Sequence, residues 1–320
     1  MKKLALGIDL GGTNTVLGLV DADGNIHAES SVSTTARDRF ENYLEDIYQA
    51  TLGLLAQAGE ECRLAGVGIG APNANYYTGC IENAANLRWR GLLPVVESVK
   101  RYFPGVPVIM TNDANAAAVG EMIYGGARGM KNFVVVTLGT GLGSGFVVNG
   151  QLVLGHDSFA GELGHVVVQR GGRACGCGLR GCLETYVSAP GMVRTAFELM
   201  AEMREPSELR DIPYNQLTSE MIYHAAVRQD PVAVATFDRT CRILGQALAD
   251  MVTITSPEAI FLFGGPTKAG KLLFEPAKRY MEENMCFVYK DKVKLLPSGI
   301  SGKNAAVLGA SALAWQALDE

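Results

Sequence analysis

The strongest constraint on the fold is a pattern of strands and turns that occurs twice along the chain. In the first copy, an apolar strand over residues 4–9 is followed by a Gly/Thr turn, a second strand and the tight Asp23-Gly24 turn. In the second copy, a strand over residues 134–138 is followed by a glycine turn, another strand and Asn149-Gly150. Asp-Gly and Asn-Gly between apolar runs are strong signals for β-hairpins. The sequence therefore predicts two domains that share one core topology.

Strand-like and helix-like patterns alternate along the rest of the chain. Strands are predicted where short apolar runs are bounded by turn residues, at 16–20, 26–32, 64–69, 106–110, 144–148 and 259–263. Helices are predicted where apolar residues recur with helical spacing, at 40–56, 114–123, 192–205, 218–252 and 305–318. Alternating strands and helices indicate an α/β fold.

Composition and charge exclude several classes of protein. The 320 residues are 48% hydrophobic and 19% charged, which is enough apolar material for a packed core. No apolar run reaches the roughly 18 residues of a membrane span, and Asp9 comes too early for a signal peptide. A net charge of −5 argues against nucleic acid as the main partner. We therefore expect a cytoplasmic protein with neither a membrane nor a nucleic-acid partner.

The two glycine turns are candidate phosphate sites, because each presents unobstructed backbone N–H groups and a threonine hydroxyl. Their candidate residues are Asp9, Gly11, Gly12 and Thr13 in the first turn and Thr137, Gly139, Thr140 and Gly141 in the second. Neither turn contains a Walker lysine or opens a helix as a dinucleotide fingerprint does. Two ordinary hairpins are the alternative, but the duplication favours a polyphosphate site in which Asp9 holds a hydrated Mg²⁺.

Asn112 and Asp113 lie at the junction between a predicted strand and the following helix. A carboxylate at this junction points out of the sheet edge, and the helix N-terminus favours its ionised form. Asp113 is therefore a candidate acceptor for the proton of a sugar hydroxyl that attacks phosphorus. The alternative is that Asp113 only caps the helix.

Three cysteines cluster within eight residues, and a histidine precedes them. Cys175, Cys177 and Cys182 together with His165 form a complete tetrahedral set of Zn²⁺ ligands. A disulfide is the alternative, but a cytoplasmic chain favours the metal. Four protein ligands leave no open position, so the zinc is expected to be structural and to fix the neighbouring Glu162 and Glu184.

These motifs resemble the ROK family (repressors, open reading frames and kinases) of the actin-like ATPase/sugar kinase superfamily. They are Asp-x-Gly-Gly-Thr at 9–13, Asn112-Asp113, Gly-Glu-x-Gly-His at 161–165 and Cys-x-Cys-Gly-x-x-Gly-Cys-x-Glu at 175–184. The resemblance covers essentially the whole chain. It implies two RNase H-like (actin/hexokinase-type) α/β domains flanking an active-site cleft. The expected division is residues 1–116 with the C-terminal helix 304–320, and a larger zinc-containing domain of residues 117–303.

The resemblance also implies roles for individual residues. Asp113 corresponds to the catalytic base of the family, and Gly264 and Gly265 correspond to the turn on the adenosine side. The expected sugar-hydroxyl ligands are Asn112, Glu162, His165 and Glu184, with Asn86 of the Asn-Leu-x-Trp segment beside the hexose. One departure is Asn73, which replaces the glycine of many relatives and adds a side chain near the expected sugar pocket.

The predicted activity is ATP-dependent phosphorylation of a hexose at its 6-hydroxyl, with glucose favoured by the Asn86 segment. The predicted cofactors are ATP, Mg²⁺ and structural Zn²⁺, and the resemblance implies a homo-oligomer, either a dimer or a tetramer. One alternative is another ROK kinase, acting on N-acetylmannosamine, N-acetylglucosamine, fructose or allose. Others are a sugar-responsive repressor, disfavoured because the phosphate loop begins at residue 9, and a sugar-binding protein without catalysis.

Overall fold

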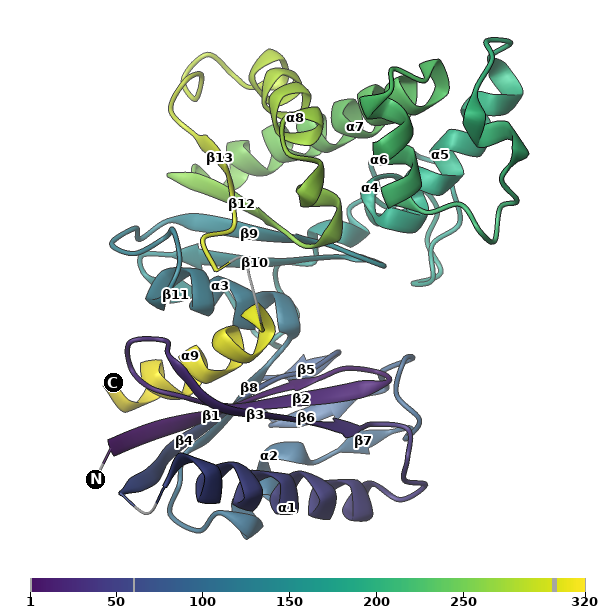
Figure 1. Cartoon of the computed structure of the whole chain (residues 1–320). Coiled ribbons are helices and arrows are strands. Elements are labelled where there is room, and N and C mark those ends of the chain that lie inside the picture. Colours follow the sequence, from purple (N-terminus) through teal and green to yellow (C-terminus); the bar gives the residue numbers. More distant parts are fainter. Residues whose placement is uncertain (1, 60, 301–303, 320) are drawn as a thin grey trace. The chain divides into compact units, whose positions relative to one another are not determined.

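The computed structural model describes residues 2–59, 61–300 and 304–319, which pack as two compact units (Figure 1). The first unit contains Met1–Met130, Gly145–Gly161 and Ser298–Glu320, and the second contains Lys131–Ser144 and Glu162–Pro297. The predicted α/β class is confirmed. The domain division expected from the sequence stays a prediction, and its boundary at residue 303 lies outside the described residues.

The first sheet has the strand order β3-β2-β1-β4-β8. Its strands are β1 (Lys2–Leu10), β2 (Asn14–Val20), β3 (Ile26–Ser33), β4 (Cys62–Gly70) and β8 (Val108–Thr111). β1, β2 and β3 pair antiparallel, whereas β4 pairs in parallel with both β1 and β8. Three parallel strands therefore end at the same edge of this sheet.

The second sheet repeats this order as β11-β10-β9-β12-β13. Its strands are β9 (Phe133–Leu138), β10 (Leu142–Val148), β11 (Gln151–Leu152), β12 (Ala259–Phe263) and β13 (Lys294–Pro297). As in the first sheet, the fourth strand in the order pairs in parallel with both of its neighbours. The internal repeat predicted from the sequence is confirmed at the level of strand order.

Helices fill the connections between the strands. They are α1 (Phe40–Ala58), α2 (Val95–Tyr102), α3 (Asp113–Ile123), α4 (Glu184–Val187), α5 (Ala189–Glu202), α6 (Ser219–Val227), α7 (Pro231–Thr255), α8 (Lys271–Asn284) and α9 (Ala305–Asp319). A small sheet of β5 (Ala74–Asn75), β6 (Cys80–Glu82) and β7 (Leu92–Leu93) also belongs to the first unit. Among the helices that the structure describes, none is both long and apolar enough to cross a membrane.

The prediction of one continuous helix over residues 218–252 is wrong, because the chain breaks between α6 and α7. Gln229 adopts a left-handed conformation with φ of 63°. Asp230 then caps α7, accepting a hydrogen bond from the backbone N–H of Ala233 at 3.0 Å, and Pro231 occupies the first helical turn. Both residue types are typical of a helix start, and they outweigh the apolar periodicity.

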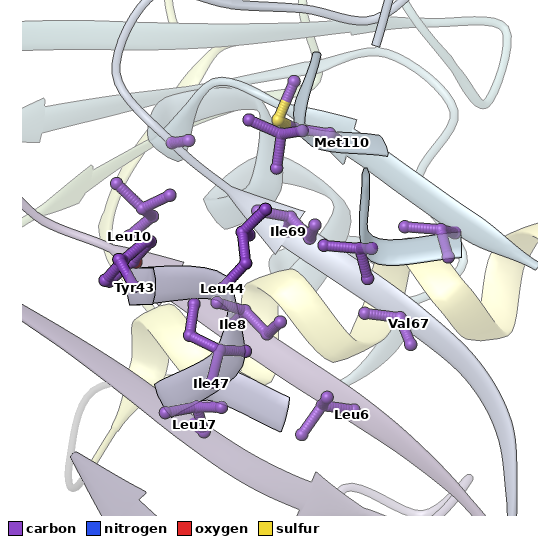
Figure 2. Packing of buried hydrophobic residues seen from close by; sticks show 14 of the residues in the cluster. Leu6, Ile8, Leu10, Leu17, Tyr43, Leu44, Ile47, Val67, Ile69 and Met110 are labelled. Carbon is purple, nitrogen blue, oxygen red and sulfur yellow. The ribbon is translucent and has the colours of Figure 1, made fainter. Parts of the chain in front are cut away.

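The core of the first unit lies between β1, its neighbouring strands and α1 (Figure 2). Leu6, Ile8 and Leu10 of β1 alternate with residues of the opposite face and are buried in this core with Tyr43 and Ile47 of α1. On the other face, α9 packs so closely on β1 and β4 that two positions leave no room for a side chain. A Cβ atom on Gly7 would overlap the carbonyl oxygen of Val307, and one on Gly68 would overlap that of Ala310.

We expect Gly68→Ala to lower the free energy of unfolding by about 1–3 kcal/mol or more, because the added methyl group must displace α9 from β4. The matched control is Gly53→Ala on α1, where a Cβ atom meets nothing within 4 Å. Alanine is favoured over glycine inside a helix, so this control is expected to stabilise by about 0.5–1 kcal/mol. Urea unfolding of both variants measures the difference. A Gly68→Ala variant as stable as the wild type would contradict the close packing of α9.

Candidate functional site

Two acidic residues meet at the edge where the parallel strands of the first sheet end. Asp9 is at the end of β1 and pairs in register with Gly70 of β4, which in turn pairs with Thr111 of β8. Asp113 follows two residues after Thr111. Burial, and then the negative charge of Asp113, raise the pKa of Asp9 from its ordinary value near 3.8 to about 6. The structure therefore brings the predicted Mg²⁺ ligand and the predicted base together.

The Asp113 carboxylate does not cap α3, which was the alternative to its role as a proton acceptor. Asn112 is the N-cap of α3, and its side chain accepts a hydrogen bond from the backbone N–H of Asn115 at 2.7 Å. Asp113 is the first helical residue, and its carboxylate accepts the adjacent N–H of Ala114 at 3.1 Å. Its side chain reaches solvent, yet the protein packed around the carboxylate desolvates it and raises its pKa.

The first glycine turn is tightly closed and lies against the Asn86 segment. The N–H of Gly11 donates to the carbonyl oxygen of Asn14 at 3.1 Å. A Cβ atom on Gly12 would lie 2.7 Å from the carbonyl oxygen of Asn86, so only glycine allows this approach. Thr13 accepts the backbone N–H of Thr34 through its own carbonyl oxygen, at 2.9 Å. The structure therefore places Asn86 beside the predicted phosphate turn.

A buried aromatic cluster, not expected from the sequence, supports both the first glycine turn and the Asn86 segment. The Trp89 ring packs against the tilted ring of Tyr43, with centroids 4.7 Å apart, and its centroid lies 5.3 Å from that of Phe40. The Tyr43 hydroxyl is 2.6 Å from that of Thr15, directly after the glycine turn. Trp89 is therefore a core residue that anchors the Asn86 segment. In the sequence, its partners Phe40 and Tyr43 on α1 show only the apolar spacing of a helix, which does not reveal this contact.

Asn73 departs from the family pattern and has a structural role here. It adopts a left-handed conformation with φ of 49°, and its side-chain amide donates to the carbonyl oxygen of Glu82 at 3.0 Å. The N–H of Glu82 donates back to the carbonyl oxygen of Asn73 at 3.0 Å. The Asn73 side chain therefore ties the residue before β5 to the last residue of β6.

In the second unit, the glycine turn after β9 lies beside Glu184, another of the predicted site residues. Glu184, the first residue of α4, accepts the backbone N–H of Leu142 through Oε2 at 3.0 Å. Thr137 accepts the N–H of Gly143 through its hydroxyl at 3.1 Å, and the N–H of Gly139 donates to the carbonyl oxygen of Gly141 at 3.0 Å. Thr140, at the tip of this turn, is exposed.

Gly264 and Gly265 follow β12, which pairs in parallel with β9. Gly264 has a φ of 108°, and a Cβ atom there would overlap the carbonyl oxygen of Leu138. The residue must therefore be glycine for the two strand ends to approach. The glycine pair predicted for the adenosine side thus lies next to the glycine turn.

His165 and the three clustered cysteines converge into a candidate metal centre. Their four ligand atoms lie within 4.8 Å of one another. Cys177 Sγ is 3.6 Å from Cys182 Sγ, and Cys175 Sγ is 3.7 Å from His165 Nδ1. Tetrahedral Zn²⁺ with Zn–S bonds of about 2.3 Å requires sulfur–sulfur distances of about 3.8 Å. The donor set and spacing fit a four-coordinate zinc, and the cysteines form no disulfide.

The two predicted sugar-binding glutamates flank this centre along the chain. Glu184 Oε1 is 3.6 Å from Cys175 Sγ, so the same carboxylate contacts both the cysteine loop and the glycine turn. Glu162 is exposed and precedes the short 3₁₀ helix Leu163–His165. The N–H of Leu163 donates to the hydroxyl of Ser144 at 3.1 Å, which anchors the segment to β10.

A pocket of about 230 Å³ adjoins Gly265 and was not predicted from the sequence. It is formed by α5, α6, α7 and the 3₁₀ helix Gly265–Ala269, and its lining includes Met192, Ser219, Tyr223, His224, Phe237 and Pro266. These residues come from four separated segments, so no local motif marks them. The pocket has the mixed apolar and polar lining that small-molecule sites use.

Similarity to known proteins identifies this chain, with its duplicated sheet order and glycine turns, as a sugar kinase of the actin-like ATPase fold. The model of the ROK family matches residues 5–317, and the chain belongs to this family. It is 36% identical over 281 residues to a glucokinase from Halalkalibacterium halodurans, covering 87% of this chain and 84% of that one. It is 33% identical over 318 residues to a glucokinase from Thermotoga maritima, covering 98% of each.

A solved structure gives the same result. A ROK family glucokinase from Streptomyces griseus, in complex with glucose and AMPPNP, is 33% identical to this chain with a TM-score of 0.78. The match covers 98% of this chain and 99% of that one.

The raised pKa of Asp9 predicts how stability depends on pH. The folded state favours the protonated carboxyl, so the wild type loses stability as the pH rises from about 4 to about 6. Asp9→Asn removes this cost. We expect the unfolding free energy of the variant, relative to the wild type, to increase by on the order of 1–2 kcal/mol between about pH 4.5 and pH 8. Urea unfolding at both pH values measures it.

The control for this prediction is Asp46→Asn. The hydrogen bond and charge of the Arg37 guanidinium lower the pKa of Asp46, so the folded state favours the carboxylate. Its replacement is expected to destabilise at pH 8 rather than stabilise. If the unfolding free energy of Asp9→Asn instead fell relative to that of the wild type as the pH rose, the conclusion that a charged Asp9 destabilises the folded state would be contradicted.

Proposed function

We propose that this protein catalyses ATP-dependent phosphorylation of glucose at the 6-hydroxyl. The observation that carries the proposal is the Asp113 carboxylate, which starts α3, has a raised pKa and leaves helix capping to Asn112. The similarity to glucokinases over most of the chain supports glucose as the substrate and ATP as the donor.

In the proposed reaction, the sugar 6-oxygen forms a bond to the γ-phosphorus while its proton moves to Asp113 and ADP leaves. Phosphoryl transfer depends mainly on positioning and charge neutralisation. A carboxylate with a raised pKa is a stronger base than an ordinary aspartate, which favours proton acceptance. Asp9 would hold Mg²⁺, which when bound neutralises phosphate charge. The positive charge of the ion would also offset the unfavourable burial of the Asp9 carboxylate.

The proposed nucleotide contacts are the glycine turn of each unit and, in the second unit, the pocket beside Gly265. In each turn, the N–H groups that follow Gly11 or Gly139 would bind phosphate, since the N–H groups of these two residues donate within the turn. The pocket between α5, α6 and α7 adjoins the Gly264–Gly265 turn, so we place the nucleoside there. The proposed sugar-hydroxyl ligands are Asn86, Asn112, Asp113, Glu162, His165 and Glu184.

The proposed zinc is structural. His165 and the three cysteines would supply all four ligands, and no position would remain for a substrate. Its role would be to hold the cysteine loop against Glu184, whose carboxylate already contacts Cys175. The proposal also includes a cytoplasmic location, a place in glucose metabolism and a homo-oligomeric state.

The competing proposal is a ROK kinase for another hexose. A coupled assay for ADP release decides between them when it compares glucose with N-acetylmannosamine, N-acetylglucosamine, fructose and allose. The kcat/KM for glucose must exceed those for the other sugars for the present proposal to stand.

We expect Asp113→Asn to reduce kcat by at least about 100-fold, because an amide cannot accept the proton and general-base catalysis contributes 10²–10⁴-fold. The Kd for AMPPNP should stay within a few-fold, since the glycine turns are unchanged. Asp230→Asn is the matched control: the same change at the N-cap of α7 should leave kcat unaltered. The measurements are kcat, the Kd for AMPPNP, the Kd for glucose and Tm. A folded Asp113→Asn variant with kcat within about fivefold of wild type would remove Asp113 as the base.

We expect protein purified without added metal to contain close to one equivalent of zinc by elemental analysis. Cys177→Ser removes one thiolate, so it should lower the zinc content and Tm and raise the KM for glucose. Cys286→Ser, at an exposed cysteine outside the cluster, is the control and should change none of these. Zinc-free wild-type protein of full activity would refute the assignment.

A further inference from the structure

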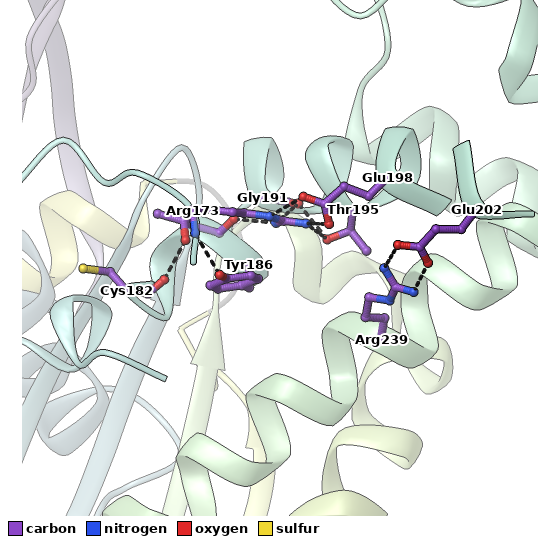
Figure 3. A network of polar contacts seen from close by, with 9 residues as sticks. Arg173, Cys182, Tyr186, Gly191, Thr195, Glu198, Glu202 and Arg239 are labelled. Atoms are coloured by element: carbon purple, nitrogen blue, oxygen red, sulfur yellow. Dashed lines mark hydrogen bonds and ion pairs between the residues drawn. The ribbon is translucent and has the colours of Figure 1, made fainter. Parts of the chain in front are cut away.

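Arg173 makes an unusually complete set of hydrogen bonds in the second unit (Figure 3). Its guanidinium has five N–H donors, and acceptors for all five lie within 3.0 Å. These are Glu198 Oε1 for Nε, the carbonyl oxygens of Thr185 and Gly191 for one terminal nitrogen, and Thr195 Oγ1 and Glu198 Oε2 for the other. The side chain is only 10% exposed. So many fixed contacts indicate that Arg173 sets the geometry of its surroundings.

Its two carbonyl acceptors lie on opposite sides of the junction between α4 and α5, which we define as residues 184–191. Thr185 is in α4 and Gly191 is in the first turn of α5. One guanidinium nitrogen bonds to both, at 2.7 and 3.0 Å. The angle between the two helices is therefore held by a single planar group, which a flexible lysine cannot replace.

The main chain of Arg173 is tied to the cysteine loop. Its carbonyl oxygen accepts the N–H of Gly181 at 2.7 Å, directly before the candidate metal ligand Cys182. Its N–H donates to the hydroxyl of Tyr186 at 3.0 Å, and its guanidinium lies 4.5 Å from the centre of that ring. Thr185 adds a bond from its hydroxyl to the carbonyl oxygen of Cys182 at 2.8 Å.

The same junction contacts the second glycine turn at two points. Glu184 accepts the N–H of Leu142 at 3.0 Å, and the N–H of Ala189 donates to the carbonyl oxygen of Gly139 at 2.9 Å. The junction therefore touches the turn at both of its ends. A change in the angle between α4 and α5 would shift the cysteine loop and this turn together.

We propose that Arg173 is a positioning residue that couples the sugar-binding side of the site to its nucleotide-binding side. It does so by holding the 184–191 junction, which supports Glu184 and the 139–143 turn at once. The proposal rests on the proposed kinase function. It predicts that loss of the guanidinium weakens glucose and nucleotide binding together, although Arg173 is assigned no contact with either ligand.

The test compares Arg173→Met with Arg239→Met. Arg239 of α7 also pairs with a glutamate of α5, Glu202, at 2.6 Å, and its guanidinium bonds go to this residue rather than to the junction (Figure 3). Isothermal titration calorimetry gives Kd for glucose and for AMPPNP, and elemental analysis gives the zinc content. For Arg173→Met we expect both Kd values to rise by at least about tenfold, because bonds to a charged donor are among the stronger polar contacts. The Arg239 variant should match the wild type.

A merely structural role would lower Tm but leave both Kd values of the folded, zinc-loaded variant unchanged, and this result would overturn the proposal. A rise in the glucose Kd alone would also overturn it, because the coupling to the glycine turn would be absent. If Arg173→Met does not fold, Arg173→Lys decides: a parallel rise of both Kd values supports the proposal, and unchanged values refute it. Wild-type protein that binds neither ligand would instead refute the kinase function itself.

Discussion

The parallel pairing of β1, β4 and β8 is the constraint on which the acidic part of the site depends. β4 lies between the other two strands, so the segments that follow β1 and β8 leave the sheet at one edge. Asp9 and Asp113 meet there, and burial together with the charge of Asp113 raises the pKa of Asp9. The second sheet repeats the strand order, and its parallel pair β9 and β12 brings Gly264 against Leu138. One topology, used twice, therefore produces two edges lined by glycine turns.

In the second unit, main-chain groups determine the geometry more than pairs of side chains do. Glu184 binds a backbone N–H, and Arg173 binds two backbone carbonyl groups. Gly181 has a φ of 92°, and a Cβ atom there would overlap the carbonyl oxygen of Gln169. The loop that carries the candidate metal ligands is thus held by its own backbone on one side and by α4 on the other.

The sequence was sufficient for features whose cause is local. Hairpin turns such as Asn149-Gly150 revealed the repeat, and close cysteines revealed the candidate metal centre. The sequence was insufficient where the contact partners of a residue are far away along the chain or are backbone atoms. α8 was missed because Pro276 lies inside it. The cap could not be assigned between Asn112 and Asp113, since both residue types cap helices equally well. Nothing in the residues around Arg173 marks the carbonyl groups that it binds, because every residue has one.

The separation of roles between Asn112 and Asp113 has a consequence for the catalytic cycle. The start of α3 is secured by an amide, which has the same charge at every pH. A carboxylate that both capped the helix and accepted a proton would lose its hold on the first turn whenever it became protonated. Here the first turn keeps its cap whichever form Asp113 takes, so the distance from the base to its substrate need not change as the proton arrives and leaves.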